Sequence, residues 1–276
     1  MSKRLSKRNL RLCYAAAVLS SFAAVLCWRR DLSVPAWNGL LSALARPGPA
    51  PWPLLAQGLL LAAILSATLF ALAWSPRPLP DAIAMLLAAA AGWAAEAWGT
   101  RLGFWSYYTR ERPPLWIIPA WMLGTLLVER AARALARHGR PPALLDSFLR
   151  PLCLLAVLVF CAPRLRDAVS WAGPAAAAVC LWLGAGRGEE NWRLPAAMFL
   201  VFFADAWGAA SQCWTYYLGR QPPALAAGIA FAMAFDAALA VGCLRLADAI
   251  LPFTVFSLEI RDEEPHNNPE ASRRTP

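Results

Sequence analysis

The sequence predicts an all-α fold, a polytopic membrane helical bundle with about eight transmembrane spans built from two parallel four-span repeats. Two observations predict the membrane bundle. The mean hydropathy of the 276 residues is +0.45 and charged residues make up 16% of the chain, whereas an ordinary soluble domain carries about 25%. Apolar segments near the roughly 20 residues that cross a bilayer also recur along the chain. A third observation, an internal repeat, predicts the two halves.

The predicted spans are separated by short stretches that contain Pro and Arg. Basic residues before the first span are typical of a signal peptide. That span ends in Cys27-Trp28-Arg29-Arg30 without a cleavage site of small residues, so a retained first span is expected. The spans cover residues 12–28, 52–74, 80–98, 114–135, 144–162, 167–185, 194–210 and 223–249.

The net charge of +9 is explained by where the Lys and Arg residues lie, and it predicts no nucleic-acid partner. Alternating the spans across a bilayer puts most of them on the side of the N-terminus, as in cytoplasmic segments. We therefore expect an integral protein of a bacterial inner membrane, in contact with membrane lipids and with both termini in the cytoplasm.

The internal repeat aligns residues 96–114 with residues 205–223 at a constant offset of 109 residues. Eight of the nineteen aligned positions are identical, and Glu96 aligns with Asp205. Several Trp and Tyr residues coincide in register, which indicates a duplication. The identical pairs are Ala97/Ala206, Trp98/Trp207, Gly99/Gly208, Trp105/Trp214, Tyr107/Tyr216, Tyr108/Tyr217, Pro113/Pro222 and Pro114/Pro223.

The same offset superposes the second, third and fourth spans on the sixth, seventh and eighth. We therefore expect residues 1–140 and 141–260 to be two four-span repeats in the same orientation, because an even number of spans preserves the direction of the chain. Residues 261–276 are polar and poor in apolar side chains, and they are expected to form a disordered cytoplasmic tail.

Glu96 and Asp205 are the first candidate catalytic residues, because each lies near the end of a predicted span. A carboxylate at the bilayer centre is unfavourable by about 2.5–3.5 kcal/mol on insertion scales, so such acids usually face a cavity or a partner. If the two halves pack face to face, both acids could line one cavity. Alternatively, each acid caps a neighbouring helix or pairs with a loop arginine; the candidate arginines are Arg101, Arg110 and Arg112.

Two further acids differ in their surroundings. Glu129 precedes Arg133 by four residues, a spacing that predicts a structural ion pair on one helix. Asp236 has no basic residue within eight positions, and it lies on a stripe with Gly228 and Ala232 at every fourth residue. Such a stripe favours close helix packing. An unpaired acid inside a span is a functional candidate, so Asp236 is the third candidate catalytic residue.

The repeated Trp and Tyr residues are the candidate substrate-binding residues. Trp and Tyr also form belts at bilayer interfaces, but the shared order Trp-x-Tyr-Tyr favours a common fold corner or an aromatic wall. The Pro pairs are expected to begin helices, and the repeated Gly residues to end helices or to allow close packing. The candidate residues are Trp98, Trp105, Tyr107, Tyr108, Trp207, Trp214, Tyr216 and Tyr217.

Motifs for common cofactors are missing from the sequence. The chain has two His residues, too few for a His-rich metal centre, and it contains neither a phosphate-binding loop G-x-x-x-x-G-K-[ST] nor a nucleophile motif G-x-S-x-G. We therefore expect no metal and no cofactor.

Glu96, Gly99, Gly103, Trp105 and Tyr107 form the pattern acid-x-x-Gly-x-x-x-Gly-x-Trp-x-Tyr. This pattern resembles motifs of the integral-membrane carotenoid enzymes, namely the heterodimer-type lycopene cyclases and the bacterioruberin-type carotenoid hydratases. The resemblance covers about forty residues of the first half and about twenty of the second. The cyclases carry Pro-x-Glu-Glu on the following helix, where this chain has Pro-Ala-Trp-Met at residues 119–122.

The resemblance implies that a carboxylic acid protonates a polyene double bond, that aromatic faces shelter the carbocation, and that loss of a proton or addition of water completes the reaction. We hypothesise a cofactor-independent acid-base enzyme of the cyclase or hydratase type, acting on a carotenoid or other isoprenoid lipid. Glu96 or Asp205 would be the general acid and the other the base. Two alternatives stay open: a proton-coupled transporter or lipid carrier, and a non-catalytic membrane assembly protein.

Overall fold

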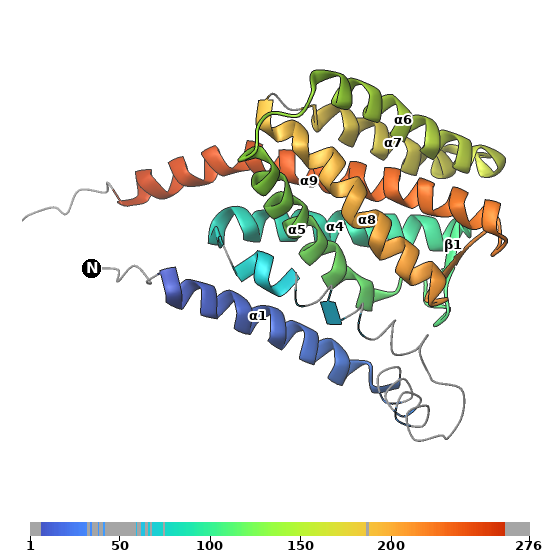
Figure 1. The fold of residues 1–276 in the computed structure, drawn as a ribbon, viewed down its shortest axis with the longest axis horizontal. Helices are drawn as coiled ribbons and strands as arrows, with labels where there is room; N and C mark the ends of the chain where they lie inside the picture. The colour runs from blue at the N-terminus through green and yellow to red at the C-terminus, as the bar shows by residue number, and fades with distance from the viewer. Residues whose placement is uncertain are drawn as a thin grey trace, which may run out of the picture.

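The computed structural model is a helical bundle with a short antiparallel sheet at one end (Figure 1). It describes residues 7–31, 68–73, 75–185 and 188–262 and isolated positions between 34 and 66; side chains are described to residue 252, except at 7, 143, 144, 188 and 189. Six of the described helices are long and apolar enough to cross a membrane. The molecule is therefore a helical bundle with the character of a membrane protein.

Seven helices correspond to seven of the predicted spans. The sixteen residues of α7 rise about 24 Å at 1.5 Å per residue, less than the roughly 30 Å of a bilayer core. Most of the predicted span 52–74 lies outside the described residues. The helices are α1 (Lys7–Trp28), α4 (Pro78–Leu102), α5 (Ile118–Ala136), α6 (Ala143–Cys161), α7 (Ala168–Leu183), α8 (Arg193–Ala210) and α9 (Pro222–Asp262).

Two predicted boundaries differ from the helix ends in the structure. Arg261 and Asp262 are the last residues of α9, and the rest of the predicted tail lies outside the described residues. The pair Pro113-Pro114 does not begin α5: Pro114 precedes the 3₁₀ turn η1 (Leu115–Ile117), and α5 begins at Ile118. A 3₁₀ turn often precedes an α-helix. The second Pro pair does begin a helix, α9.

The purely helical prediction missed two strands, β1 (Trp105–Tyr107) and β2 (Trp214–Tyr216). They pair antiparallel, with Ser106 opposite Thr215. The two strands are equivalent segments of the internal repeat, so the same sequence segment pairs with its own copy. A strand of three residues is too short to show the alternation typical of strands. Because the partner of each strand is also distant in the sequence, the pairing could not be predicted.

The core of the bundle consists of α4, α5, α8 and α9. Helix α4 packs on α5 and α9, and α8 packs on α9 and α5, while α6 and α7 cover another face of α9. Figure 1 shows α1 on the side of the bundle away from α6 and α7. The predicted boundary at residue 140 falls between α5 and α6, yet elements from both sides of it share this core.

The backbone turns at both ends of the strands recur at the same offset as the sequence repeat. Gly103 ends α4 with φ 72°, and Gln212 has φ 60° at the equivalent position. Arg110 has φ 60°, and its equivalent Gly219 has φ 99°. In each pair a residue with a side chain adopts the left-handed conformation that Gly adopts most easily. The surrounding structure therefore imposes these turns in both copies.

Candidate functional site

The carboxylate of Glu96 lies inside the bundle and accepts three hydrogen bonds. The side chain of Trp105 donates from Nε1 at 2.9 Å, the hydroxyl of Tyr107 at 2.8 Å, and Nε1 of Trp121 at 3.2 Å. Glu96 is 3% exposed. Hydrogen bonds to a charged group contribute about 1.5–3 kcal/mol each, so these three donors offset much of the unfavourable burial of a carboxylate.

Asp205 occupies the equivalent position and has the same kinds of partner. Nε1 of Trp214 donates to its carboxylate at 3.1 Å, and the hydroxyl of Tyr216 donates at 2.5 Å. In both copies the Trp lies nine residues after the acid and the Tyr eleven residues after it. The acid, the Trp and the Tyr of each copy therefore form one repeated hydrogen-bonded unit.

One alternative prediction was that these acids pair with loop arginines. It is wrong for the described part of the chain. Arg101, Arg110 and Arg112 make no ion pair with Glu96 or Asp205, whose partners are the Trp and Tyr side chains. Neither acid caps a neighbouring helix among the described residues, because the donors to both carboxylates are Trp and Tyr side chains and not backbone N–H groups. The two acids thus belong to the interior of the fold.

Two glycines bring the Trp rings onto the helices. A Cβ atom at Gly99 would lie 1.9 Å from Cη2 of Trp105, and one at Gly208 would lie 1.9 Å from Cη2 of Trp214. Both glycines lie within helices, so the close-packing alternative is the correct one. The missing side chain lets each indole lie directly against its helix, where Nε1 reaches the acid one turn earlier.

Tyr107 and Tyr216 connect all three candidate acids. Burial raises the pKa of Tyr107 well above its usual value, and the charges of Glu96, Asp236 and Asp205 raise it further. Burial likewise raises the pKa of Tyr216, with further contributions from Asp205 and Asp236. Both phenols therefore remain protonated donors. Each of the three carboxyl groups lies within electrostatic range of Tyr107, so the acids gather in one region.

Asp236 differs from the other two acids because no described residue donates a hydrogen bond to it. It lies on α9 within electrostatic range of both Glu96 and Asp205. The stripe of small residues packs closely, as predicted: Ala232 is 4% exposed, and a Cβ atom at Gly228 would lie 2.2 Å from the Tyr216 ring. Asp236 is therefore an intramembrane carboxyl group, and its contacts give it no evident role in stabilising the fold.

An aromatic wall adjoins the acids. Trp98 stacks on Phe235 with ring centroids 5.6 Å apart, and Phe231 stacks on Phe160 at 4.1 Å. Trp105 lies 6.0 Å from Phe231 and 6.4 Å from Phe235. The sequence reasoning missed the Phe residues because they lie outside the repeated segment. Phe235 directly precedes Asp236 on α9 and Phe231 lies five residues before it, so the wall and this acid share one helix.

Three of the predicted binding residues lie elsewhere or have other partners. Tyr108 is 54% exposed and does not join the acids. The hydroxyl of Tyr217 donates to the backbone oxygen of Phe160 at 2.6 Å, under the guanidinium of Arg164. Nε1 of Trp207 is buried without an acceptor among the described residues. The paired Trp and Tyr residues therefore have unequal roles.

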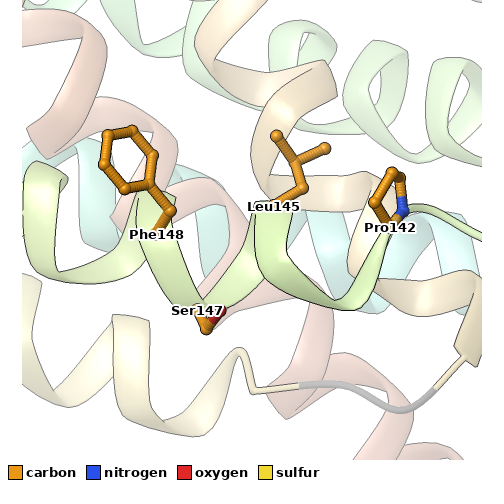
Figure 2. A pocket seen from close by; sticks show the side chains of 4 residues that line it. All are labelled: Pro142, Leu145, Ser147 and Phe148. Carbon is orange, nitrogen blue, oxygen red and sulfur yellow. The ribbon is translucent and has the colours of Figure 1, made fainter.

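A shallow groove on α6 lies far from the acids. Its lining is Pro142, Leu145, Ser147 and Phe148 (Figure 2). Phe148 precedes Phe160 of the aromatic wall by twelve residues, which is about 18 Å along a helix. The groove therefore does not open onto the acids.

Comparison of the chain with protein-family models, with curated proteins and with solved structures finds no match. Chemical interpretation of the site therefore depends on its geometry.

Two carboxylates held by N–H and O–H donors can carry negative charge, and the unpaired carboxyl group of Asp236 can exchange a proton. Adjacent aromatic faces can stabilise a cation. Together these groups suit acid-base chemistry on an apolar molecule.

Proposed function

We propose that this protein is an integral-membrane acid-base enzyme that acts on a carotenoid or other isoprenoid lipid, by a reaction of the cyclase or hydratase type. The observation that carries the proposal is Asp236, a carboxyl group without a hydrogen-bond donor in the described structure, within electrostatic range of two acids and on the same helix as Phe231 and Phe235 of the aromatic wall. The resemblance of the segment from Glu96 to Tyr107 to carotenoid cyclases and hydratases supports the same chemistry.

The geometry favours Asp236 as the general acid, where the sequence favoured Glu96 or Asp205. A carboxyl group without donors in an apolar environment is most stable when protonated, and such a group can transfer its proton to a carbon of a double bond. The donors around Glu96 and Asp205 instead stabilise carboxylates. These two acids would stabilise the carbocation and accept a proton from a neighbouring carbon, while addition of water would give the hydrated product.

Lipid analysis of cells that express single variants tests the proposal. Asp236→Asn keeps the size of the side chain but cannot deliver the proton, so the product lipid should disappear and its precursor should accumulate. Tyr108→Phe is the control, because Tyr108 is exposed, and it should leave the lipid profile unchanged. An unchanged profile in Asp236→Asn, with normal amounts of folded protein in the membrane, would exclude the proposed role.

A second candidate function, a non-catalytic membrane assembly protein, is favoured by the density of the aromatic wall. Phe104 and Phe231 are 0% and 1% exposed, and stacked rings fill the space between α4, α6 and α9. A substrate would have to displace some of these rings. Purified protein that converts a prenyl lipid in detergent would favour the enzyme, and a protein that only co-purifies with partner proteins would favour the assembly role.

We also propose the finer architecture that the sequence suggests, with eight spans, two four-span repeats and both termini in the cytoplasm of a bacterium. The equivalent hydrogen bonds of Glu96 and Asp205 and the pairing of β1 with β2 support a duplication. Cysteine labelling from each side of the membrane tests the topology: a single Cys at exposed Arg101 should react only from the side opposite to one at exposed Arg137.

A further inference from the structure

A network of buried charges lies at the end of the core opposite the two strands. Arg130 on α5 donates to both carboxylate oxygens of Asp81 on α4, at 2.9 and 2.5 Å. Arg193 on α8 donates to Glu129 at 2.9 Å and to Asp248 at 2.5 Å. These ion pairs connect four helices, and each of these two arginines has a close carboxylate partner.

Two further arginines have weaker partners. Glu129, already bonded to Arg193, also faces Arg133 at 3.5 Å and Arg77 at 3.9 Å. Among the described side chains, the four arginines of this network therefore share three carboxylates, those of Asp81, Glu129 and Asp248, which leaves a surplus of one positive charge.

Several N–H groups of this network have no hydrogen-bond acceptor among the described residues. They are Nε of Arg130, Nη2 of Arg133, and Nε of Arg133, which faces Glu129 at 3.5 Å without a hydrogen bond; all three atoms are buried. Buried polar groups normally have partners, and an unpaired donor on a charged group is unfavourable. The side chains of Arg77 and Arg133 remain 45% and 31% exposed, so an external acceptor can reach these two side chains, next to the buried N–H groups.

A phosphate group has the chemistry that these arginines lack. Its oxygens accept several hydrogen bonds from guanidinium groups, and one negative charge balances the surplus. The exposed residues Arg137, His138 and Arg140 follow on the same side and add positive field that attracts anions. We propose that Arg77 and Arg133, beside the buried Arg130, form a binding site for a phosphate group, belonging either to an anionic lipid head group or to a soluble phosphate compound.

Thermal unfolding of the full-length protein in detergent tests this site. The probes are phosphatidylglycerol, a phosphodiester with one net charge, phosphatidylcholine, its neutral counterpart, and inorganic pyrophosphate. The variants are Arg77→Gln and Arg133→Gln. Arg101→Gln is the matched control, because it removes the same charge from the exposed last turn of α4, far from the network. Arg77 is about half exposed, so its replacement keeps the fold.

The proposal predicts that phosphatidylglycerol or pyrophosphate raises the unfolding temperature of the wild type and of Arg101→Gln, and that phosphatidylcholine does not. In Arg77→Gln and Arg133→Gln the concentration for half the effect should rise about tenfold, because a charged donor to the phosphate is lost. A response to the lipid alone identifies a head-group site, and a response to pyrophosphate alone identifies a soluble ligand. No response to either probe, or equal responses in all three variants, would overturn the site. The outcome is independent of the proposed enzymatic function.

Discussion

Replacement of Gly99 by Ala tests whether the contact between this helix and the Trp105 ring holds the site together. The added Cβ atom would lie 1.9 Å from Cη2 and 2.2 Å from Cζ2 and Cζ3 of Trp105. Because the indole must move away, its Nε1 loses the hydrogen bond to Glu96. Overpacking destabilises by about 1–3 kcal/mol and loss of a hydrogen bond to a buried charge by about 1.5–3 kcal/mol.

A matched control separates this effect from helix propensity. A Cβ atom at Gly124 of α5 would meet nothing within 4 Å, so Gly124→Ala should stabilise by about 0.5–1 kcal/mol. Gly99→Ala gains the same helix propensity, which is smaller than the losses from overpacking and from the missing hydrogen bond. The net effect should be a destabilisation of about 2–5 kcal/mol. The free energy of unfolding is measured by circular dichroism as the fraction of denaturing detergent increases.

A double-mutant cycle makes the test specific. In a Trp105→Ala background the clash partner is gone, so Gly99→Ala should no longer destabilise. Gly208→Ala should behave like Gly99→Ala, because Trp214 lies equally close to it. If Gly99→Ala is as stable as Gly124→Ala, or if it destabilises equally without Trp105, the close-packing explanation is wrong.

Three further predictions concern the polar groups. Asp81→Asn should lower the free energy of unfolding in detergent by about 3–5 kcal/mol, because it leaves the charge of Arg130 buried without its partner. A decrease below about 1 kcal/mol would mean that the pair is solvated. Tyr107→Phe removes the hydrogen bond to Glu96 and should lower the free energy of unfolding by about 1.5–3 kcal/mol. Tyr108→Phe, at an exposed position, should change it little. Equal decreases in the two variants would contradict the role given to the Tyr107 hydroxyl. Folding raises the pKa values of Tyr107 and Tyr216. The free energy of unfolding should therefore fall as the pH rises above about 10, where only the unfolded phenols release protons. It should fall less steeply in Tyr107→Phe, and a pH profile identical to that of the wild type would refute this linkage.

The sequence was informative where the chain repeats itself. The aligned register predicted that Glu96 and Asp205 are equivalent, and it offered close packing as one role of Gly99 and Gly208. Both inferences required only that similar segments fold alike. The hydrogen-bond partners were harder to predict, because the chain must leave the helix, form a strand and turn back before a Trp nine residues later can reach the acid.

The residues outside the repeat gave no comparable signal. Trp121 on α5 and Phe160 on α6 join the site only through tertiary packing, and an apolar residue in a membrane helix is usual in any orientation. The charge network was also hidden: the predicted pair of Glu129 with Arg133 is present at 3.5 Å, but the shorter bond of Glu129 goes to Arg193. Long-range pairing of this kind depends on the arrangement of the helices, which composition does not encode.

Deuterium transfer tests the proposed chemistry most directly. Purified protein is incubated in D₂O with a lipid extract of the source cells, and the prenyl lipids are analysed by mass spectrometry. Protonation of a double bond by the exchanged carboxyl group of Asp236 predicts a product with one deuterium bound to carbon in the wild type and none in Asp236→Asn. Absence of any deuterated product from the wild type, or equal labelling by the Asp236→Asn variant, would contradict the proposal.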